Sequence, residues 1–276
     1  ALWKQKPGAG QPRQGLVARV DIPATVSHFT PRPGYVYLPP AALVPNPPKL
    51  PVLVLLSGQP GGPVNIILAG RLTVAMNQYA RSHGGLTPII VVPDQLGAAT
   101  SNPMCVDGPL GNSATYITVD VPNWIRTHLS VQTQAGAWGV GGYSQGGTCS
   151  LQFGTGYPGI FGTIVDMSGE ARPADGTRQQ TIDRGFGGDE AAYEAADPVA
   201  IMQRNAPYAD TLAIIATGQY DNRYGPQADQ VAAAATAAGI TVVRQVVPGT
   251  SHDWHMVRWV FTEGIGPVMR HLGLER

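Results

Sequence analysis

The sequence predicts an α/β fold in one domain, with a mostly parallel central sheet flanked by helices. Short continuous apolar runs, such as VLVLL at 52–56 and IIVV at 89–92, are typical of strands buried on both faces of a parallel sheet. Stretches with helical spacing of apolar residues alternate with these runs, which favours helices on both faces. The 276 residues are 43% hydrophobic, enough for one large core, and we find no internal repeat.

The first residues of the chain differ from the rest. Residues 1–15 are polar and contain proline and glycine, so we expect a tether that precedes a single domain at 16–276. Residues 16–22 and 35–38 have the apolar pattern of edge strands. Residues 39–51 are rich in proline, which predicts an exposed connection before the first buried strand.

The other elements follow from the same two patterns, continuous apolar runs for strands and helical spacing for helices. Strands are expected at 163–167, 212–217 and 240–247, and helices at 66–81, 116–129, 227–238 and 254–272. Residues 168–207 are polar and lack a clear period, so we expect an irregular insert there. Because loops carried by a rigid scaffold often select substrates, we expect this insert to form a small cap over a site.

The composition argues against several classes of partner. Charged residues make up only 13% of the chain, the formal net charge is zero and no basic run is present, so no nucleic-acid partner is expected. No apolar run reaches the roughly 18 residues that a membrane span needs. The 35 glycines and 25 prolines are typical of an exported protein. The chain starts at Ala1 without a signal-like segment, so we expect a mature form or a domain of a longer precursor.

The two cysteines, Cys105 and Cys149, leave two alternatives open. They suit a single disulfide in a protein outside the cytoplasm, or two buried thiols in a protein inside it. Neither belongs to a C-x-x-C pair or to a zinc-ligand spacing, so they predict no metal site.

The strongest functional signal is the pentapeptide GYSQG at 142–146, which has the pattern G-x-S-x-G. A serine on a sharp turn from a strand into a helix needs residues without bulk two positions before and after it, and the turn exposes the serine oxygen. The pattern also arises by chance in glycine-rich chains, and an ordinary glycine-rich turn is the alternative. The nucleophile that this motif predicts is Ser144.

A serine hydroxyl becomes nucleophilic when an imidazole takes its proton, and a buried carboxylate orients that imidazole. Such groups collect beyond the carboxyl ends of parallel strands. His252 follows the last strand and a turn, and we predict that it is the base; an ordinary loop histidine is the alternative. A metal site that pairs it with His255 lacks a third ligand. The remaining histidines lie near turns or helix ends, where solvated or capping roles are favoured: His28, His83, His128 and His271.

Asp221 is the predicted acid of the site. It directly follows an apolar strand, which gives the order serine, aspartate, histidine along the chain. Its alternative role is in an Asx turn or as a helix cap. Glu170 and Asp94 are reserve candidates, whereas Asp253 adjoins His252 and is expected to point away from it.

With these residues, the chain resembles the α/β-hydrolase superfamily and, more narrowly, its esterase D-like group, which includes the mycobacterial mycolyltransferases. The resemblance extends from about Val36 to Leu272. The segments that carry it are LLSGQPGG (55–62), IIVVPDQ (89–95), GVGGYSQGG (139–147), FGGDEAAYEAADP (186–198) and SHDWHMVRW (251–259).

The resemblance implies an oxyanion hole made of two backbone N–H groups. One would come from Gln145, the residue after the serine, and the other from Gln59, in the turn after the first buried strand. Ser57 stands where relatives often have His or Asp. The mycolyltransferases use a glutamate where Asp221 is best placed here, and residues 95–113 do not match their trehalose pocket. The resemblance therefore implies a general esterase.

The proline-rich entry is similar to that of actinobacterial esterase domains that follow a membrane-anchored N-terminal region. This likeness implies an extracytoplasmic domain, which is secreted, periplasmic or part of the cell envelope, with anchoring through a preceding region. It also implies a disulfide between Cys105 and Cys149 beside the helix after Ser144. A buried thiol at Cys149 is the alternative.

We therefore expect a serine carboxylic-ester hydrolase that works through an acyl-enzyme, acts on a small-molecule or lipid ester, and needs no metal or organic cofactor. An acyltransferase that moves a lipid acyl group onto a sugar or polyol is one alternative. A non-catalytic binding protein on a hydrolase scaffold is another. The sequence leaves the acyl length, the alcohol partner and the oligomeric state open.

Overall fold

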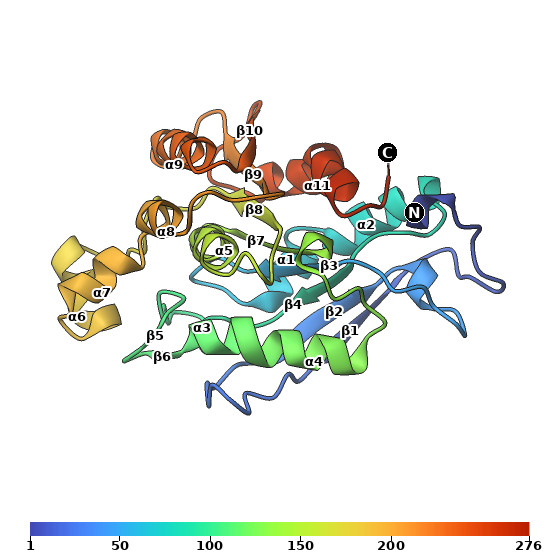
Figure 1. Ribbon diagram of the computed structural model, residues 1–276, viewed down its shortest axis with the longest axis horizontal. Helices are drawn as coiled ribbons and strands as arrows, with labels where there is room; N and C mark the ends of the chain where they lie inside the picture. Colours follow the sequence, from blue (N-terminus) through green and yellow to red (C-terminus); the bar gives the residue numbers. More distant parts are fainter. Residues whose placement is uncertain (276) are drawn as a thin grey trace.

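Eight strands form one central sheet in the computed structural model, which describes residues 1–275 (Figure 1). Their order across the sheet is β1-β2-β4-β3-β7-β8-β9-β10. The pairs β1–β2 and β2–β4 are antiparallel, and all the other neighbours are parallel. The strands are β1 (Leu16–Val20), β2 (Gly34–Leu38), β3 (Val52–Leu56), β4 (Ile89–Val92), β7 (Trp138–Tyr143), β8 (Thr163–Met167), β9 (Leu212–Gly218) and β10 (Thr241–Val247). The predicted single-domain, mostly parallel α/β fold is confirmed.

Helices connect the strands and cover the sheet. They are α1 (Pro63–Leu68), α2 (Leu72–Ser82), α3 (Ser113–Thr115), α4 (Val121–His128), α5 (Gln145–Gly156), α6 (Arg178–Phe186), α7 (Glu190–Ala195), α8 (Pro198–Asn205), α9 (Gly225–Ala237), α10 (Trp254–Trp259) and α11 (Gly266–His271). A π-helical turn, Tyr116–Asp120, joins α3 to α4, and another, Val260–Gly264, follows α10. A two-residue hairpin, β5 (Asp107–Gly108) and β6 (Gly111–Asn112), lies in the loop after β4. No helix among residues 1–275 has the length and apolar character of a membrane span.

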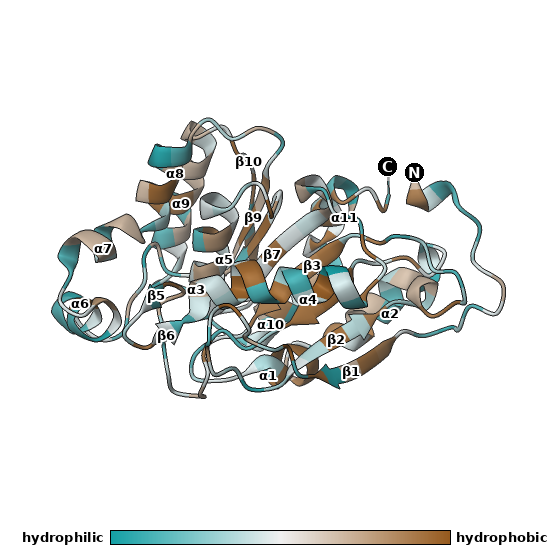
Figure 2. Cartoon of the chain, turned by 60° about the horizontal axis from the view of Figure 1, so that its bottom comes forward, coloured by the Kyte–Doolittle hydropathy of each residue, from teal (hydrophilic) through white to brown (hydrophobic). Residues whose placement is uncertain are grey.

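Alternating side chains of β9 show how the core is divided between the two faces of the sheet. Ala213 and Ile215 belong to an apolar cluster with residues of α5 and α9, such as Leu151 and Val231. Ile214 and Ala216 point to the opposite face of the sheet, where they belong to a cluster with residues of α10 and α11. This period of two is the signature of a strand covered on both faces. Figure 2 shows the central strands as the most hydrophobic part of the chain.

The prediction of one continuous helix at 66–81 is wrong. The chain forms α1 and α2 with a break between them, because Arg71 has a left-handed backbone with φ of 51°. Gly70 permits the sharp bend: a Cβ there would lie 2.5 Å from the backbone oxygen of Ile66. The helical spacing continues across the break, so the pattern of apolar residues did not reveal it.

We expected an irregular insert at 168–207, and this prediction is wrong. The insert contains α6, α7 and α8. Its helices begin at local caps: Thr177 and Gln180 form a capping box at α6, and Asp197 accepts from the backbone N–H of Val199 at α8. α6 and α7 project at one end of the molecule (Figure 1). They are held by a small separate apolar cluster, which consists of Met104, Ile182, Phe186, Tyr193 and Ala196.

Residues 1–15 lie against the body of the protein at α2. Gln11 Nε2 donates to the backbone oxygen of Gly84 at 3.1 Å, and the backbone N–H of Gly15 donates to Asn77 Oδ1 at 2.8 Å. The domain boundary after residue 15 stays a prediction.

Candidate active site

Ser144 occupies the sharp turn between β7 and α5. Its backbone has φ of 57° and ψ of −117°, in the positive-φ region that side chains rarely adopt. A Cβ on Gly142 would lie 2.2 Å from the backbone oxygen of Gly146, and a Cβ on Gly146 would lie 2.3 Å from that of Leu56. Both glycines of the motif are therefore required by close backbone packing on either side of Ser144.

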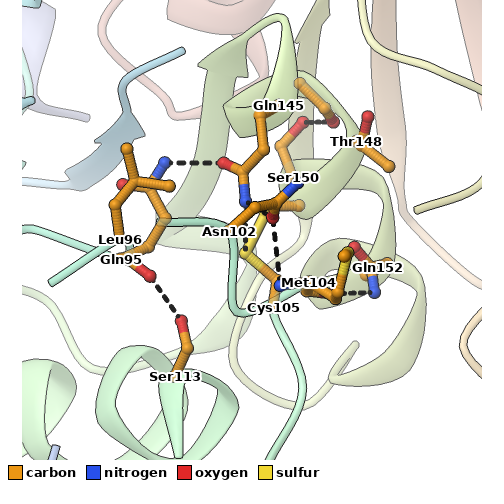
Figure 3. Close-up of a disulfide and its surroundings, with 12 residues drawn as sticks. Gln95, Leu96, Asn102, Met104, Cys105, Ser113, Gln145, Thr148, Ser150 and Gln152 are labelled. Carbon is orange, nitrogen blue, oxygen red and sulfur yellow. Dashed lines mark hydrogen bonds between the residues drawn. A yellow bond between two sulfur atoms is a disulfide. The ribbon is translucent and has the colours of Figure 1, made fainter. Parts of the chain in front are cut away.

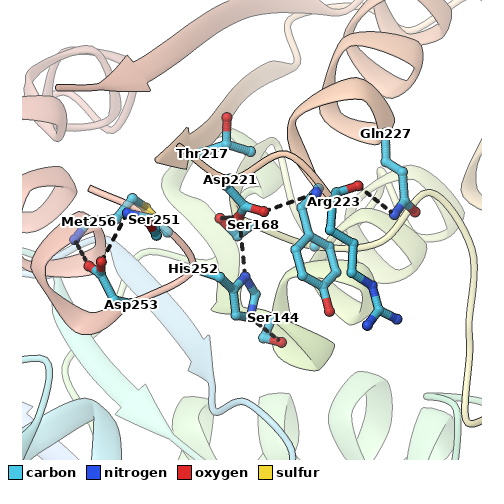
Figure 4. Close-up of polar contacts among 12 residues, drawn as sticks. Ser144, Ser168, Thr217, Asp221, Arg223, Gln227, Ser251, His252, Asp253 and Met256 are labelled. Carbon is cyan, nitrogen blue, oxygen red and sulfur yellow. Dashed lines mark hydrogen bonds and ion pairs between the residues drawn. The ribbon is translucent and has the colours of Figure 1, made fainter. Parts of the chain in front are cut away.

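The structure brings Ser144, His252 and Asp221 together from three loops at the carboxyl ends of the parallel strands (Figure 4). His252 Nε2 lies 3.0 Å from Ser144 Oγ, and His252 Nδ1 lies 3.3 Å from Asp221 Oδ2. The two ring nitrogens thus face a hydroxyl and a carboxylate. This is the arrangement in which an imidazole can accept a serine proton while a carboxylate stabilises the resulting imidazolium.

Asp221 is buried and held by two further hydrogen bonds. Ser168 Oγ donates to Asp221 Oδ2 at 3.0 Å, and the backbone N–H of Tyr224 donates to Asp221 Oδ1 at 3.0 Å. The side chain of Asp221 is only 2% exposed, so its negative charge faces His252 with little competition from water.

The reserve acids have other partners. Asp94 accepts two hydrogen bonds from the guanidinium of Arg32, at 2.8 Å each, and has a structural role in the loop after β4. Glu170 pairs with Arg223 at 3.2 Å. Asp253 caps α10 by accepting from the backbone N–H of Met256 at 3.0 Å.

Two aromatic rings enclose the imidazole of His252. The ring of Tyr224 lies 4.3 Å from it and that of Tyr143 lies 5.0 Å from it, and both stack on it. Burial lowers the pKa of His252 below its ordinary 6.5, and the negative charge of Asp221 opposes this shift in part. His252 therefore favours the neutral form, which a general base needs.

Two backbone N–H groups beside Ser144 lack acceptors within residues 1–275. One belongs to Gln145, the first residue of α5, because the first N–H groups of a helix have no partner inside it. The other belongs to Gln59, in the turn after β3, which lines the same pocket as Ser144. That turn approaches the serine closely: a Cβ on Gly58 would lie 3.4 Å from Ser144 Cβ.

A disulfide joins Cys105 to Cys149 and fastens the loop after β4 to α5, with 5.6 Å between the two Cα atoms. Figure 3 shows the polar network beside it. Gln145 Nε2 donates to Asn102 Oδ1 at 2.9 Å, and Gln95 Nε2 donates to Gln145 Oε1 at 2.9 Å. The disulfide and this network hold the loop against the start of α5.

Ser144 opens into a pocket of about 200 Å³. The pocket is lined by α5, the loop that contains Cys105, the turn after β9, and residues 173–176 of the insert. Burial raises the pKa of Glu170 in this pocket, and the charge of Arg223 opposes the shift. Most of its lining side chains are polar and include Asn102, Gln145, Thr148, Gln152, Glu170 and Arg223.

The other histidines have local partners or positions away from Ser144. His83 stacks on Tyr79, and His128 stacks on Trp124. His271 Nδ1 lies 2.7 Å from Thr163 Oγ1. His28 has positive φ in the loop before β2, and His255 lies in α10. Within residues 1–275, no three His, Cys, Asp or Glu side chains form a group that could hold a metal ion.

Sequence reasoning assigned no role to three residues that shape the site. Ser168 directly follows β8, so its position at a strand end was an available signal, but nothing in the sequence pairs it with Asp221. Tyr143 directly precedes Ser144 and Tyr224 lies three residues after Asp221, but no sequence pattern predicts their stacking on His252.

Comparisons with known proteins agree on a family and on a fold. Residues 29–260 match the model of the family described as "Putative esterase". An uncharacterized protein of Corynebacterium glutamicum is 37% identical over 194 residues, which are 69% of this chain and 46% of that protein. The chain thus spans about half the length of this curated relative.

Solved structures with the same fold include esterases and other hydrolases. A ferulic acid esterase has a TM-score of 0.77 at 19% identity, with 94% of this chain and 99% of that chain covered. An S-formylglutathione hydrolase from Agrobacterium tumefaciens has a TM-score of 0.73 at 18% identity, with 95% and 96% covered. The fluorophosphonate-binding serine hydrolase F of Staphylococcus aureus has a TM-score of 0.70 at 14% identity, with 94% and 99% covered.

Proposed function

The chain belongs to the "Putative esterase" family and is an esterase, and from this premise we propose that it hydrolyses carboxylic esters through an acyl-enzyme on Ser144. The observation that carries the proposal is the hydrogen-bonded series from Ser144 Oγ to His252 at 3.0 Å and on to Asp221 at 3.3 Å. A serine, an imidazole and a buried carboxylate in this order are the groups that activate a hydroxyl for attack on a carbonyl.

In the proposed first half-reaction, Ser144 Oγ attacks the ester carbonyl while His252 Nε2 takes the hydroxyl proton. The tetrahedral oxyanion accepts hydrogen bonds from the N–H groups of Gln145 and Gln59, and one donor of this kind typically lowers the barrier by about 3 kcal/mol. His252 then gives the proton to the departing alcohol, which leaves the acyl group on Ser144. Water repeats the sequence, releases the acid and restores the serine. Asp221 stabilises the imidazolium in both halves.

The substrate we propose is an ester with a small or polar group beside the carbonyl. The supporting observation is the pocket of about 200 Å³, whose lining side chains are mostly polar. A long acyl chain would displace water from the charged side chains of Glu170 and Arg223, and removing charged groups from water is costly. Known structures of this fold include a ferulic acid esterase and an S-formylglutathione hydrolase, whose names also point to esters or thioesters with polar groups.

Acyl transfer to a polyol is the second candidate. The supporting observation is that amide and carboxylate side chains such as Asn102, Gln152 and Glu170 line the pocket, where they could bind hydroxyl groups of an acceptor. Offering trehalose together with an activated ester distinguishes the two reactions, because transfer yields a sugar ester and hydrolysis yields only free acid.

We also propose an extracytoplasmic location and the role of a cap for residues 168–207. The disulfide supports the location, since disulfides persist in oxidising compartments. Residues 173–176 in the pocket lining support the cap.

The test of the proposed function is the substitution Ser144→Ala. We expect hydrolysis of p-nitrophenyl acetate to fall by roughly 10⁴-fold or more, because the nucleophile is lost while the fold stays intact. Labelling by a fluorophosphonate should disappear with it. The matched control is Ser82→Ala on α2, whose hydroxyl donates to the backbone oxygen of Tyr79 and which should keep both properties. Full activity of Ser144→Ala would refute the proposal, and an unlabelled wild-type protein would favour a non-catalytic binding role.

A further inference from the structure

The side chain of Gln95 joins the two turns that carry the proposed oxyanion donors. Gln95 lies in the loop after β4 and is completely buried. Its Nε2 donates to the backbone oxygen of Ser57 at 2.7 Å and to Oε1 of Gln145 at 2.9 Å. Ser57 lies two residues before Gln59, and Gln145 is itself a donor-bearing residue (Figure 3 shows Gln95 and Gln145).

The orientation of this amide is fixed by its partners. A backbone oxygen can only accept, so the group that faces Ser57 has to be the amide nitrogen. The nitrogen then has one hydrogen for Ser57 and one for Gln145. Because strand order places β3 between β4 and β7, a side chain from the end of β4 can reach both neighbouring turns.

Gln95 is held firmly from its own side. Ser113 Oγ, which is also buried, donates to the backbone oxygen of Gln95 at 2.8 Å. The preceding residue, Asp94, is clamped by the guanidinium of Arg32 at 2.8 Å. We call the two hydrogen bonds of Gln95 Nε2 the bridge. Because the backbone around Gln95 is held by Ser113 and Arg32, the bridge connects both turns to a fixed position in the loop after β4.

We propose that Gln95 is a positioning residue for the oxyanion hole, which sets the separation of the Gln59 and Gln145 N–H groups. This inference rests on the proposed function. Oxyanion donors act through preorganisation, and they have to lie within about 3 Å of the position that the developing oxygen occupies. Loss of the bridge leaves both N–H groups present but allows the two turns to move relative to each other.

The experiment compares Gln95→Met with Gln245→Met. Both replace a glutamine with a side chain of similar length that cannot donate. Gln245 is a matched control, because its Nε2 also donates to a backbone oxygen, that of Gly264 at 2.9 Å, but away from the two turns. With p-nitrophenyl acetate as substrate, we expect Gln95→Met to lower kcat by about 10- to 100-fold. This decrease is no larger than the one expected when an oxyanion donor itself is removed. KM should stay within about twofold, and Gln245→Met should keep the wild-type kcat.

Binding of phenylboronate provides a readout that a merely structural role would not change. Boronate forms a tetrahedral adduct with the serine and resembles the charged intermediate, so its affinity should fall by the same factor as kcat/KM. Thermal unfolding curves of the wild type and of each variant show at which assay temperatures all of them are folded, and the rates are compared there.

Gln145→Met removes the bond from Gln95 and the bond from Gln145 to Asn102 but keeps the backbone N–H of residue 145, so it serves if Gln95→Met fails to fold. Both variants lose the hydrogen bond between Gln95 and Gln145, so the double variant should lose less activity than the product of the two single losses. An unchanged kcat in both single variants, or a loss confined to KM, would overturn the positioning role while the Ser144-dependent turnover of the wild type stands. A wild type without such turnover would overturn both proposals.

Discussion

At the scale of single residues, the environment of His252 sets the pH range in which the proposed base is neutral. A general base has to be neutral, and His252 is neutral above its pKa. Burial lowers that pKa, while Asp221 raises it in part. At pH 6.5, where an ordinary exposed histidine is half protonated, more than half of His252 is therefore neutral and available as the proposed base.

We predict that the acidic limb of kcat/KM against pH has its midpoint below 6.5, because the pKa of His252 in the free enzyme is lowered by burial. Asp221→Asn removes the charge that raises this pKa, so it should move the midpoint further down. It should also lower kcat by about 10⁴-fold, as loss of the orienting carboxylate does in serine proteases. Rate profiles between pH 4 and 9 measure both effects.

Asp183→Asn, on the exposed side of α6, is the control and should leave the profile unchanged. A midpoint of the wild type above pH 7 would contradict the prediction.

Sequence patterns pointed to the three candidate residues that the structure brings together, but not to residues whose contacts depend on strand order. Ser144 belongs to a motif, and Asp221 and His252 follow apolar runs at the ends of strands. Gln95 also follows an apolar run, but its role depends on β4 lying beside β3 and β3 beside β7. Those neighbours are far apart along the chain, so no local pattern contains this information.

At the scale of elements, continuous apolar runs located buried strands such as β3 and β4 accurately, because a strand covered on both faces favours apolar residues. Helix boundaries were less predictable. The break between α1 and α2 depends on the left-handed backbone of Arg71, and the helices of the insert have too few apolar residues to give a clear period. Their caps, such as Thr177 with Gln180, were the available signal.

The disulfide is the element-scale feature with the largest expected effect on stability. We predict that replacing both Cys105 and Cys149 with alanine lowers the free energy of unfolding by about 4 kcal/mol, the loop-closure value for cysteines 44 residues apart. Chemical denaturation measures the loss. Because the tethered loop lines the pocket, kcat/KM should fall as well.

Reduction of the wild type with dithiothreitol should reproduce the behaviour of the double variant and should not affect the variant itself. An unfolding midpoint that is insensitive to both changes would refute a stabilising role of the bridge.

At the scale of the whole molecule, two buried carboxylates give opposite contributions to the pH dependence of stability. Burial raises the pKa of Asp166 to about 7, although the backbone N–H of Gly169 and the charge of Arg244 oppose the shift. Burial also acts to raise the pKa of Asp120, but hydrogen bonds from Ser27, Val26 and Thr25 outweigh it and lower that pKa. In mildly acidic solution Asp166 therefore retains a proton in the native state that it would lose on unfolding, whereas Asp120 is ionised.

The contribution of Asp166 is fully present below its unfolded pKa of 3.8 and is lost as pH rises through about 7. We predict that Asp166→Asn, which resembles the protonated acid, raises the free energy of unfolding at pH 5 by less than half as much as at pH 8, because only part of the loss has occurred by pH 5. At pH 8 it should raise the free energy of unfolding by roughly 2 to 4 kcal/mol, since the native state no longer has to ionise a buried acid. Denaturant unfolding at the two pH values measures the difference.

Asp120→Asn is the control of opposite sign. The contribution of Asp120 is present above its ordinary pKa of 3.8 and is lost as pH falls through the lower native value. This variant should be less stable than the wild type at pH 8. Equal effects of Asp166→Asn at pH 5 and pH 8 would show that Asp166 does not titrate as described.

The small apolar cluster around Met104 has a consequence for how such a protein can diversify. It anchors α6 and α7 to the disulfide-tethered loop and shares no member with the two clusters that pack against the sheet. Met104 also lines the pocket. α6, α7 and the loop segment around Met104 can therefore be exchanged together as one unit, whereas α8 packs against the sheet through Met202 and stays with it.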